Sequence, residues 1–135
     1  MEYKYFNSNP DASTFKSGKP KNWNKDDSAI RAISCACNLT WEKAFDKLST
    51  ISRYSHDVIS KNVVNDFCLS NGFTYHTFGK PSSGTKRPSI EEFIDDHPKG
   101  TYIIYFANYF ICIIDGCYYD VKKDTKSSIY SYWEK

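Results

Sequence analysis

Apolar residues recur at helical spacing through the first half of the chain and give way to β-branched and aromatic runs in the second half. A first helix is predicted to begin near Ser28, with Asp26 or Asp27 as its N-cap. A second begins after Thr40, and a third runs from about Ser55 to Ser70, where Asn71-Gly72 ends it. The apolar stripes of these helices are Ala29, Ile30, Ala32, Ile33 and Ala36; Trp41, Ala44, Phe45 and Leu48; and Val58, Ile59, Val63, Val64 and Phe67.

Short alternating or aromatic segments predict the strands. Residues 1–6 form a short edge strand, and the polar residues 7–25 form a long loop. Ser89 and Glu92 have the spacing of a capping box, so a short helix should begin there and end at His97-Pro98. Asp115-Gly116 predicts a two-residue hairpin turn. The other predicted strands are 73–78, 101–107, 109–114, 117–121 and 128–133, with a loop over 79–88.

This order of elements predicts an α+β fold in one domain, residues 1–135, with N-terminal helices packed on a C-terminal antiparallel sheet. Aromatic residues make up 17% of the chain, which is too much apolar surface for a disordered protein. There is no run of about 18 apolar residues that could span a membrane, and residues 1–6 lack the apolar core of a signal peptide. The odd count of five cysteines agrees with free thiols. We therefore expect a cytoplasmic protein.

The charge balance argues against a polyanionic partner. Lys and Arg number 18 and Asp and Glu 16, which leaves a net charge of +2 and favours neither nucleic acid nor a membrane surface. Nucleic-acid binding through the lysine-rich loop 16–25 and through Lys80, Lys86 and Arg87 is an alternative, but a solvated surface is the simpler interpretation. Residues 79–86 superficially resemble a phosphate-binding loop, yet they lack Walker A spacing and lead to Pro88 rather than into a helix.

Neither the cysteines nor the histidines have the spacing of a metal site, and no cofactor is expected. Cys35 and Cys37 lie two apart on a helix and therefore point to nearly opposite sides. Cys112 and Cys117 flank the hairpin turn as diagonal neighbours on one face, which is typical of buried core thiols. The histidines, expected in structural positions near a helix start, in a strand and at a helix end, are His56, His76 and His97.

The two-residue turn also sets the register of its hairpin. Ile114 then faces Cys117, and Ile111 faces Asp120. Tyr109 and Asp120 become diagonal neighbours on one face, within reach of each other's side chains. Taken alone, such a pair is an ordinary cross-strand polar contact.

An ordered set of short motifs runs through the chain: Tyr5–Pro10, Asp27–Ile33, Thr40–Phe45, Ser89–Tyr102, Ala107–Tyr109, Asp115-Gly116, Tyr119-Asp120 and Tyr132-Trp133. Together they resemble small papain-fold, C39-like cysteine-peptidase homologues of Firmicutes and their phages. In that family the motif at 27–33 reads Asp-Cys-x-x-Arg-Ala-Ile, and the segment at 107–109 carries a histidine. The resemblance covers essentially the whole chain in the right order and implies a papain-like fold.

The resemblance implies a catalytic site in which two essential residues are replaced. A cysteine at a helix N-terminus would be the nucleophile, and a histidine on the facing strand would be its base. Here the cysteine position is Ser28 and the histidine position is Tyr109, while Asp120 stands where a third residue would orient the histidine. A tyrosine, with a pKa of about 10, is a weak substitute for a histidine base.

These replacements predict a catalytically inactive papain-like domain whose partner is a host protein. The abundance of Lys, Asn and Tyr corresponds to AT-rich codons and points to a low-GC bacterium or its phage. In a phage, inhibition of a host or defence protein is one natural use of such a domain. The alternative is a hydrolase in which Ser28 is the nucleophile and Tyr109, Asp120 or His76 is a non-standard base.

Overall fold

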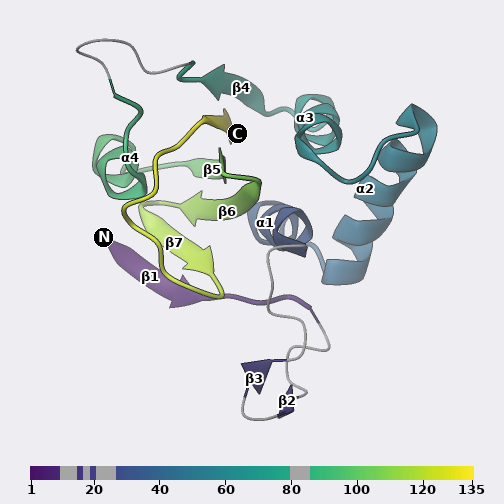
Figure 1. Ribbon diagram of the computed structural model, residues 1–135, viewed down its shortest axis with the longest axis horizontal. Helices are drawn as coiled ribbons and strands as arrows, with labels where there is room; N and C mark the ends of the chain where they lie inside the picture. Colours follow the sequence, from purple (N-terminus) through teal and green to yellow (C-terminus); the bar gives the residue numbers. More distant parts are fainter. Residues whose placement is uncertain (10–14, 17–18, 21–26, 80–85) are drawn as a thin grey trace.

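A six-stranded mixed sheet with helices on both of its faces forms the centre of the molecule (Figure 1). The computed structural model describes residues 1–9, 15–16, 19–20, 27–79 and 86–135. In chain order the elements are β1 (Glu2–Tyr5), β2 (Phe15–Lys16), β3 (Lys19–Pro20), α1 (Ser28–Cys37), α2 (Trp41–Ser55), α3 (Lys61–Ser70), β4 (Thr74–Thr77), α4 (Ile90–Asp96), β5 (Thr101–Phe106), β6 (Tyr109–Ile114), β7 (Cys117–Asp120) and β8 (Ser131–Glu134).

The strand order is β1-β7-β6-β5-β8-β4, and β2 and β3 form a separate two-stranded sheet. Every pair from β7 across to β4 is antiparallel, whereas β1 runs parallel to β7. The α+β class and the edge position of residues 1–6 are therefore confirmed. The expected antiparallel C-terminal sheet is corrected to a mixed one, because Glu2 pairs with Cys117 across almost the whole chain, and local patterns do not encode such a pairing.

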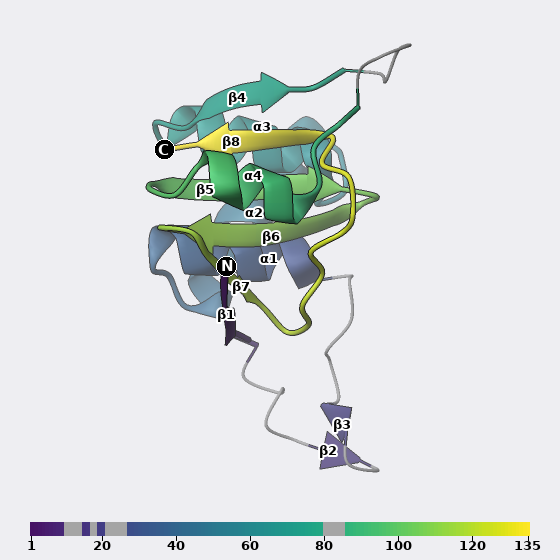
Figure 2. The same cartoon turned by 90° about the vertical axis from the view of Figure 1, so that its left-hand side faces the viewer.

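Each face of the sheet has its own apolar core. Helices α1, α2 and α3 cover one face, and α4 covers the other (Figure 2). Strands β5 and β6 lie between the two layers, so their buried residues run consecutively rather than alternating, as in Tyr102–Ile104 and Tyr109–Ile113. Phe110 and Trp133 belong to the core under α1–α3, whereas Tyr109 belongs to the core under α4.

Most predicted helix ends are confirmed. The α1 helix begins at Ser28, and the Thr40 side chain caps α2 by accepting a hydrogen bond from the Lys43 amide at 3.2 Å. Ser89 and Glu92 form the capping box of α4, and Asn71 ends α3 before a glycine with φ +84°. Asp27 occupies the N-cap position of α1, but its carboxylate makes no cap hydrogen bond.

The predicted start of the third helix is wrong. Helix α2 continues through Ser55 and stops at His56, whose φ is +54°, and α3 begins only at Lys61. His56 therefore ends a helix instead of lying near the start of one, and Val58 lies outside both helices with 72% of its surface exposed. A left-handed residue that is not Gly or Asn gives no local signal for a helix end, which explains the error.

Two tight hairpin turns flank β6. Asp115 and Gly116, with φ of +48° and +75°, bring Ile114 opposite Cys117, as predicted. On the other side, Ala107 and Asn108 have φ of +47° and +62° and join β5 to β6. This second turn makes Tyr109 the first residue of β6.

Candidate functional site

The N-terminus of α1 packs where β6 begins and β7 ends. Ser28 is the first residue of the helix, Tyr109 the first of β6 and Asp120 the last of β7. The structure thus gathers these three predicted positions at one end of the sheet. Their side chains, however, do not form one continuous chain of hydrogen bonds.

Tyr109 and Asp120 are in direct contact, as the hairpin register predicts. The Tyr109 hydroxyl donates a hydrogen bond of 2.7 Å to Oδ2 of Asp120. Both side chains are buried, with Asp120 2% exposed. The pair is therefore part of the protein interior rather than an exposed cross-strand contact.

Arg31 connects this pair to the start of α1. Its Nη2 donates to the Tyr109 hydroxyl at 2.8 Å and lies 3.4 Å from Oδ1 of Asp120, while its Nη1 forms an ion pair with Asp27. Asp27 also accepts hydrogen bonds from Trp41 Nε1 at 3.2 Å and from Asn9 Nδ2 at 3.1 Å. One buried guanidinium thus holds two carboxylates, which is how a protein accommodates such charges away from water.

The surroundings of the pair shift both proton equilibria. Burial raises the pKa of Tyr109 well above its ordinary range, and the hydrogen bond to Asp120 raises it further, against the opposing effect of Arg31. Burial also raises the pKa of Asp120, although the Tyr109 hydroxyl and Arg31 both favour its charged form. Tyr109 therefore keeps its proton at neutral pH and acts as a donor, so it cannot serve as a base.

Ser28 is turned toward the main chain of β6. Its Oγ accepts a hydrogen bond of 3.1 Å from the Phe110 amide, and the residue is 1% exposed. A serine nucleophile must donate its hydrogen to a base, and no side chain among the described residues accepts one from Ser28. His76, the third candidate base, lies on edge strand β4, stacks on Tyr132 and contacts Glu134 at 3.2 Å, while β8 and β5 separate β4 from β6.

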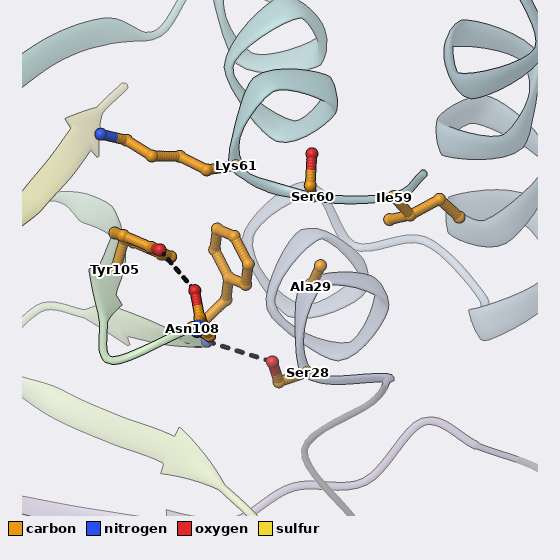
Figure 3. A pocket seen from close by; sticks show the side chains of 8 residues that line it. Ser28, Ala29, Ile59, Ser60, Lys61, Tyr105 and Asn108 are labelled. Carbon is orange, nitrogen blue, oxygen red and sulfur yellow. Dashed lines mark hydrogen bonds between the residues drawn. The ribbon is translucent and has the colours of Figure 1, made fainter. Parts of the chain in front are cut away.

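A cavity of about 330 Å³ lies beside Ser28 (Figure 3). Ser28 and Ala29 line it from the start of α1, Ser60 and Lys61 from the start of α3, and Tyr105 and Phe110 from β5 and β6. Tyr109 and Asp120 do not line it. The serine position and the tyrosine–aspartate pair therefore face different surroundings.

The cysteines and histidines occupy structural positions. Nowhere in the described chain do three or more His, Cys, Asp or Glu side chains gather in a way that could hold a metal ion. Cys112 and Cys117 are buried core residues, and burial raises the pKa of the Cys112 thiol well above its ordinary value, with Cys35 close by. His97 ends α4, as predicted, and its ring stacks on that of Phe93 with 4.0 Å between the ring centres.

Much of the basic loops lies outside the described residues, namely 17–18, 21–25 and Lys80, as does Asp26. Arg87 is described, and its guanidinium lies 4.6 Å from the centre of the Tyr130 ring. No helix in the described residues is both long and apolar enough to cross a membrane.

Sequence reasoning missed the residues that organise the site. Arg31 follows Asp27 by four positions, a spacing that favours an ion pair on a helix, and this was the available signal. Its reach to β6 and β7 and the role of Lys61 at the cavity follow only from the packing of distant elements.

No protein-family model matches this chain, and neither a curated protein nor a solved structure is significantly similar to it.

Proposed function

We propose that this chain is a papain-like domain that has lost peptidase chemistry and acts by binding another protein. The observation that carries the proposal is the hydrogen bonding of Ser28 and Tyr109. The serine accepts from the Phe110 amide, and the tyrosine donates to Asp120. A nucleophile–base pair requires the serine to donate to its base, and no side chain among the described residues accepts from Ser28.

The placement of these residues supports the papain-like part of the proposal. A helix N-terminus faces the end of a β-hairpin, and the two positions that would hold the cysteine and the histidine lie there with Asp120. Arg31 and Trp41, which belong to the same ordered motifs, are both tied to Asp27 beside them. This placement supports the proposal that the scaffold of such a site remains while its chemistry is lost.

The retained cavity supports the binding part of the proposal. It opens between α1, α3 and the β5–β6 hairpin, and apolar and polar groups both line it. In the setting of a phage or a low-GC bacterium, the partner would be a host or defence protein in the cytoplasm that this domain inhibits.

A peptidase assay tests the loss of activity. The purified chain is incubated with unfolded casein and with a mixed peptide library, and new termini are detected by mass spectrometry. We expect no cleavage by the wild type. Cleavage that Ser28→Ala abolishes would overturn the proposal and restore the hydrolase alternative.

A capture experiment tests the binding role. Immobilised wild type, Lys61→Glu and Lys43→Glu are exposed to bacterial lysate, and the affinity of each retained protein is then measured with purified components. Lys43 is an exposed lysine of α2 and serves as the charge-matched control. We expect partners that bind the wild type and the control but not Lys61→Glu; equal binding by all three, or no binding, contradicts the proposal.

A further inference from the structure

Two helix N-termini meet at the cavity beside Ser28. Ser28 and Ala29 are the first two residues of α1, and Ser60 and Lys61 are the N-cap and first residue of α3 (Figure 3). Each of these helices has ten residues, and neither has a side-chain cap or an acidic residue in its first turn. Within the described residues no carboxylate therefore accepts a hydrogen bond from a first-turn amide of either helix, and these amides carry partial positive charge.

The side chains around the cavity add to this positive character. Lys61 is its one charged lining residue among the described part of the chain. Its ammonium lies 5.3 Å from the centre of the Tyr75 ring and 5.4 Å from that of Tyr105, so the charge lies on the Tyr105 side of the cavity (Figure 3). The nearby carboxylates of Asp27 and Asp120 are instead engaged by Arg31.

Ser28 supplies a donor at the opposite side of the same cavity. The residue is buried and lines the cavity, and its Oγ already accepts from the Phe110 amide. The hydroxyl hydrogen has no acceptor within the described residues. A buried hydroxyl normally donates as well as accepts, so this hydrogen is available to a ligand oxygen.

Apolar groups form part of the remaining lining, beside the side chains of Tyr105 and Asn108, and the cavity limits the size of the ligand. The Phe110 ring, the Ile59 side chain and the Ala29 methyl face the cavity. Its volume of about 330 Å³ is at the small end for ligand pockets and suits one or two amino-acid residues. One lysine and the partial charges of the helix amides match the single negative charge of a carboxylate better than the double charge of a phosphate.

We propose that this cavity binds the free C-terminal carboxylate of a peptide that ends in an apolar residue. The carboxylate lies at the start of α3, between the first-turn amides and the Lys61 ammonium, and the terminal side chain packs on Phe110 and Ile59. This inference rests on the proposed protein-binding role and specifies which part of the partner is recognised.

Nuclear magnetic resonance with a matched pair of small probes tests the proposal. The complete chain, labelled with ¹⁵N, is titrated with N-acetyl-L-phenylalanine and separately with N-acetyl-L-phenylalaninamide, which has the same shape without the charge. We expect the acid to shift the Ala29 and Lys61 amide resonances saturably. The affinity of the amide should be lower than that of the acid by about tenfold or more. Equal binding of both probes, or no shift with the acid, overturns the proposal.

Two substitutions assign the charge. Lys61→Gln should weaken binding of the acid by about tenfold, whereas Lys43→Gln on the exposed face of α2 should leave it unchanged. Lys61→Arg keeps the charge and should retain most of the affinity, which separates loss of charge from damage to the fold. Equal affinity of Lys61→Gln and the wild type would contradict the assigned role of Lys61.

Inorganic phosphate is the competing anion. Phosphate is added to the complex with the acid. If phosphate displaces the acid and has the lower dissociation constant of the two, the cavity is a phosphate site and the carboxylate proposal is overturned. The probe titration and the lysate capture are independent, so their failures can be told apart. A macromolecular partner that still binds when the acid does not would leave the proposed function standing and remove only this inference.

Discussion

The Tyr109 hydroxyl donates a 2.7 Å hydrogen bond to Oδ2 of Asp120, and the same hydroxyl accepts from Nη2 of Arg31 at 2.8 Å. One phenol thus bridges a buried carboxylate and a buried guanidinium. A neutral histidine has its donor and its acceptor on two different ring nitrogens. The single hydroxyl of Tyr109 donates to Asp120 and accepts from Arg31 at the same oxygen. The contact stabilises the interior, and its geometry explains why Tyr109 is no base.

Removal of that hydroxyl should be costly. Tyr109→Phe leaves Asp120 and Arg31 each short of one buried partner, and we expect the free energy of unfolding to fall by about 1–3 kcal/mol. Urea denaturation measures the change. Tyr105→Phe is the matched control, because its hydroxyl bonds to the exposed side chain of Asn108, and it should change stability by no more than about 0.5 kcal/mol. Equal losses in both variants would show that the network adds nothing.

The raised pKa of Asp120 predicts a specific pH dependence. Burial is the main cause of the shift, so the folded state binds this proton more tightly than the unfolded state, where the pKa is near 3.8. The resulting contribution to stability is fully present below the unfolded pKa and is lost as the pH rises through the folded pKa. The free energy of unfolding of the wild type, minus that of Asp120→Asn, should therefore decrease as the pH rises from about 4 to 7.

Urea titrations at several pH values measure this difference directly. Asp95→Asn, on the exposed side of α4, removes a surface carboxylate and is the control variant in the same titrations. An increase with pH for Asp120→Asn would contradict the direction of the shift.

The two serine N-caps should differ in their contribution to stability. Ser89 forms a capping box with Glu92, whereas Ser60 makes no cap hydrogen bond at the start of α3. Ser89→Ala should cost about 1 kcal/mol, while Ser60→Ala should cost less than about 0.5 kcal/mol. Thermal and urea unfolding compare the two variants. Similar losses would mean that the Ser60 side chain does cap α3, and that the cavity is less open to an anion than we infer.

The turn that starts β6 contains a strained alanine. Ala107 has φ +47°, a conformation that costs an L-residue with a Cβ but not glycine. Ala107→Gly should raise the free energy of unfolding by about 0.5–1 kcal/mol. The reverse sign is expected for Ala44→Gly within α2, where the methyl group is fully buried. Destabilisation by Ala107→Gly would show that the Ala107 methyl makes a stabilising contact.

Local chemistry determined much of the fold in advance. The caps at Thr40 and Ser89, the stop at Asn71-Gly72 and the Asp115-Gly116 turn each depend on residues within one turn of the chain. The same turn placed Tyr109 beside Asp120, because a two-residue hairpin leaves only one register. These features were predictable because a few neighbouring residues set the backbone conformation.

The tertiary structure alone decided how these elements combine. The parallel pairing of β1 with β7 and the reach of Arg31 to two strands both join distant parts of the chain. The same is true of Ser28, which the sequence placed at a helix start but which only the packing of α1 on β6 turned toward the Phe110 amide. Sequence patterns report local preferences of the backbone and the side of an element that is buried. The partner on that side is set by which packing buries the most apolar surface while satisfying every polar group, and that is a property of the whole chain.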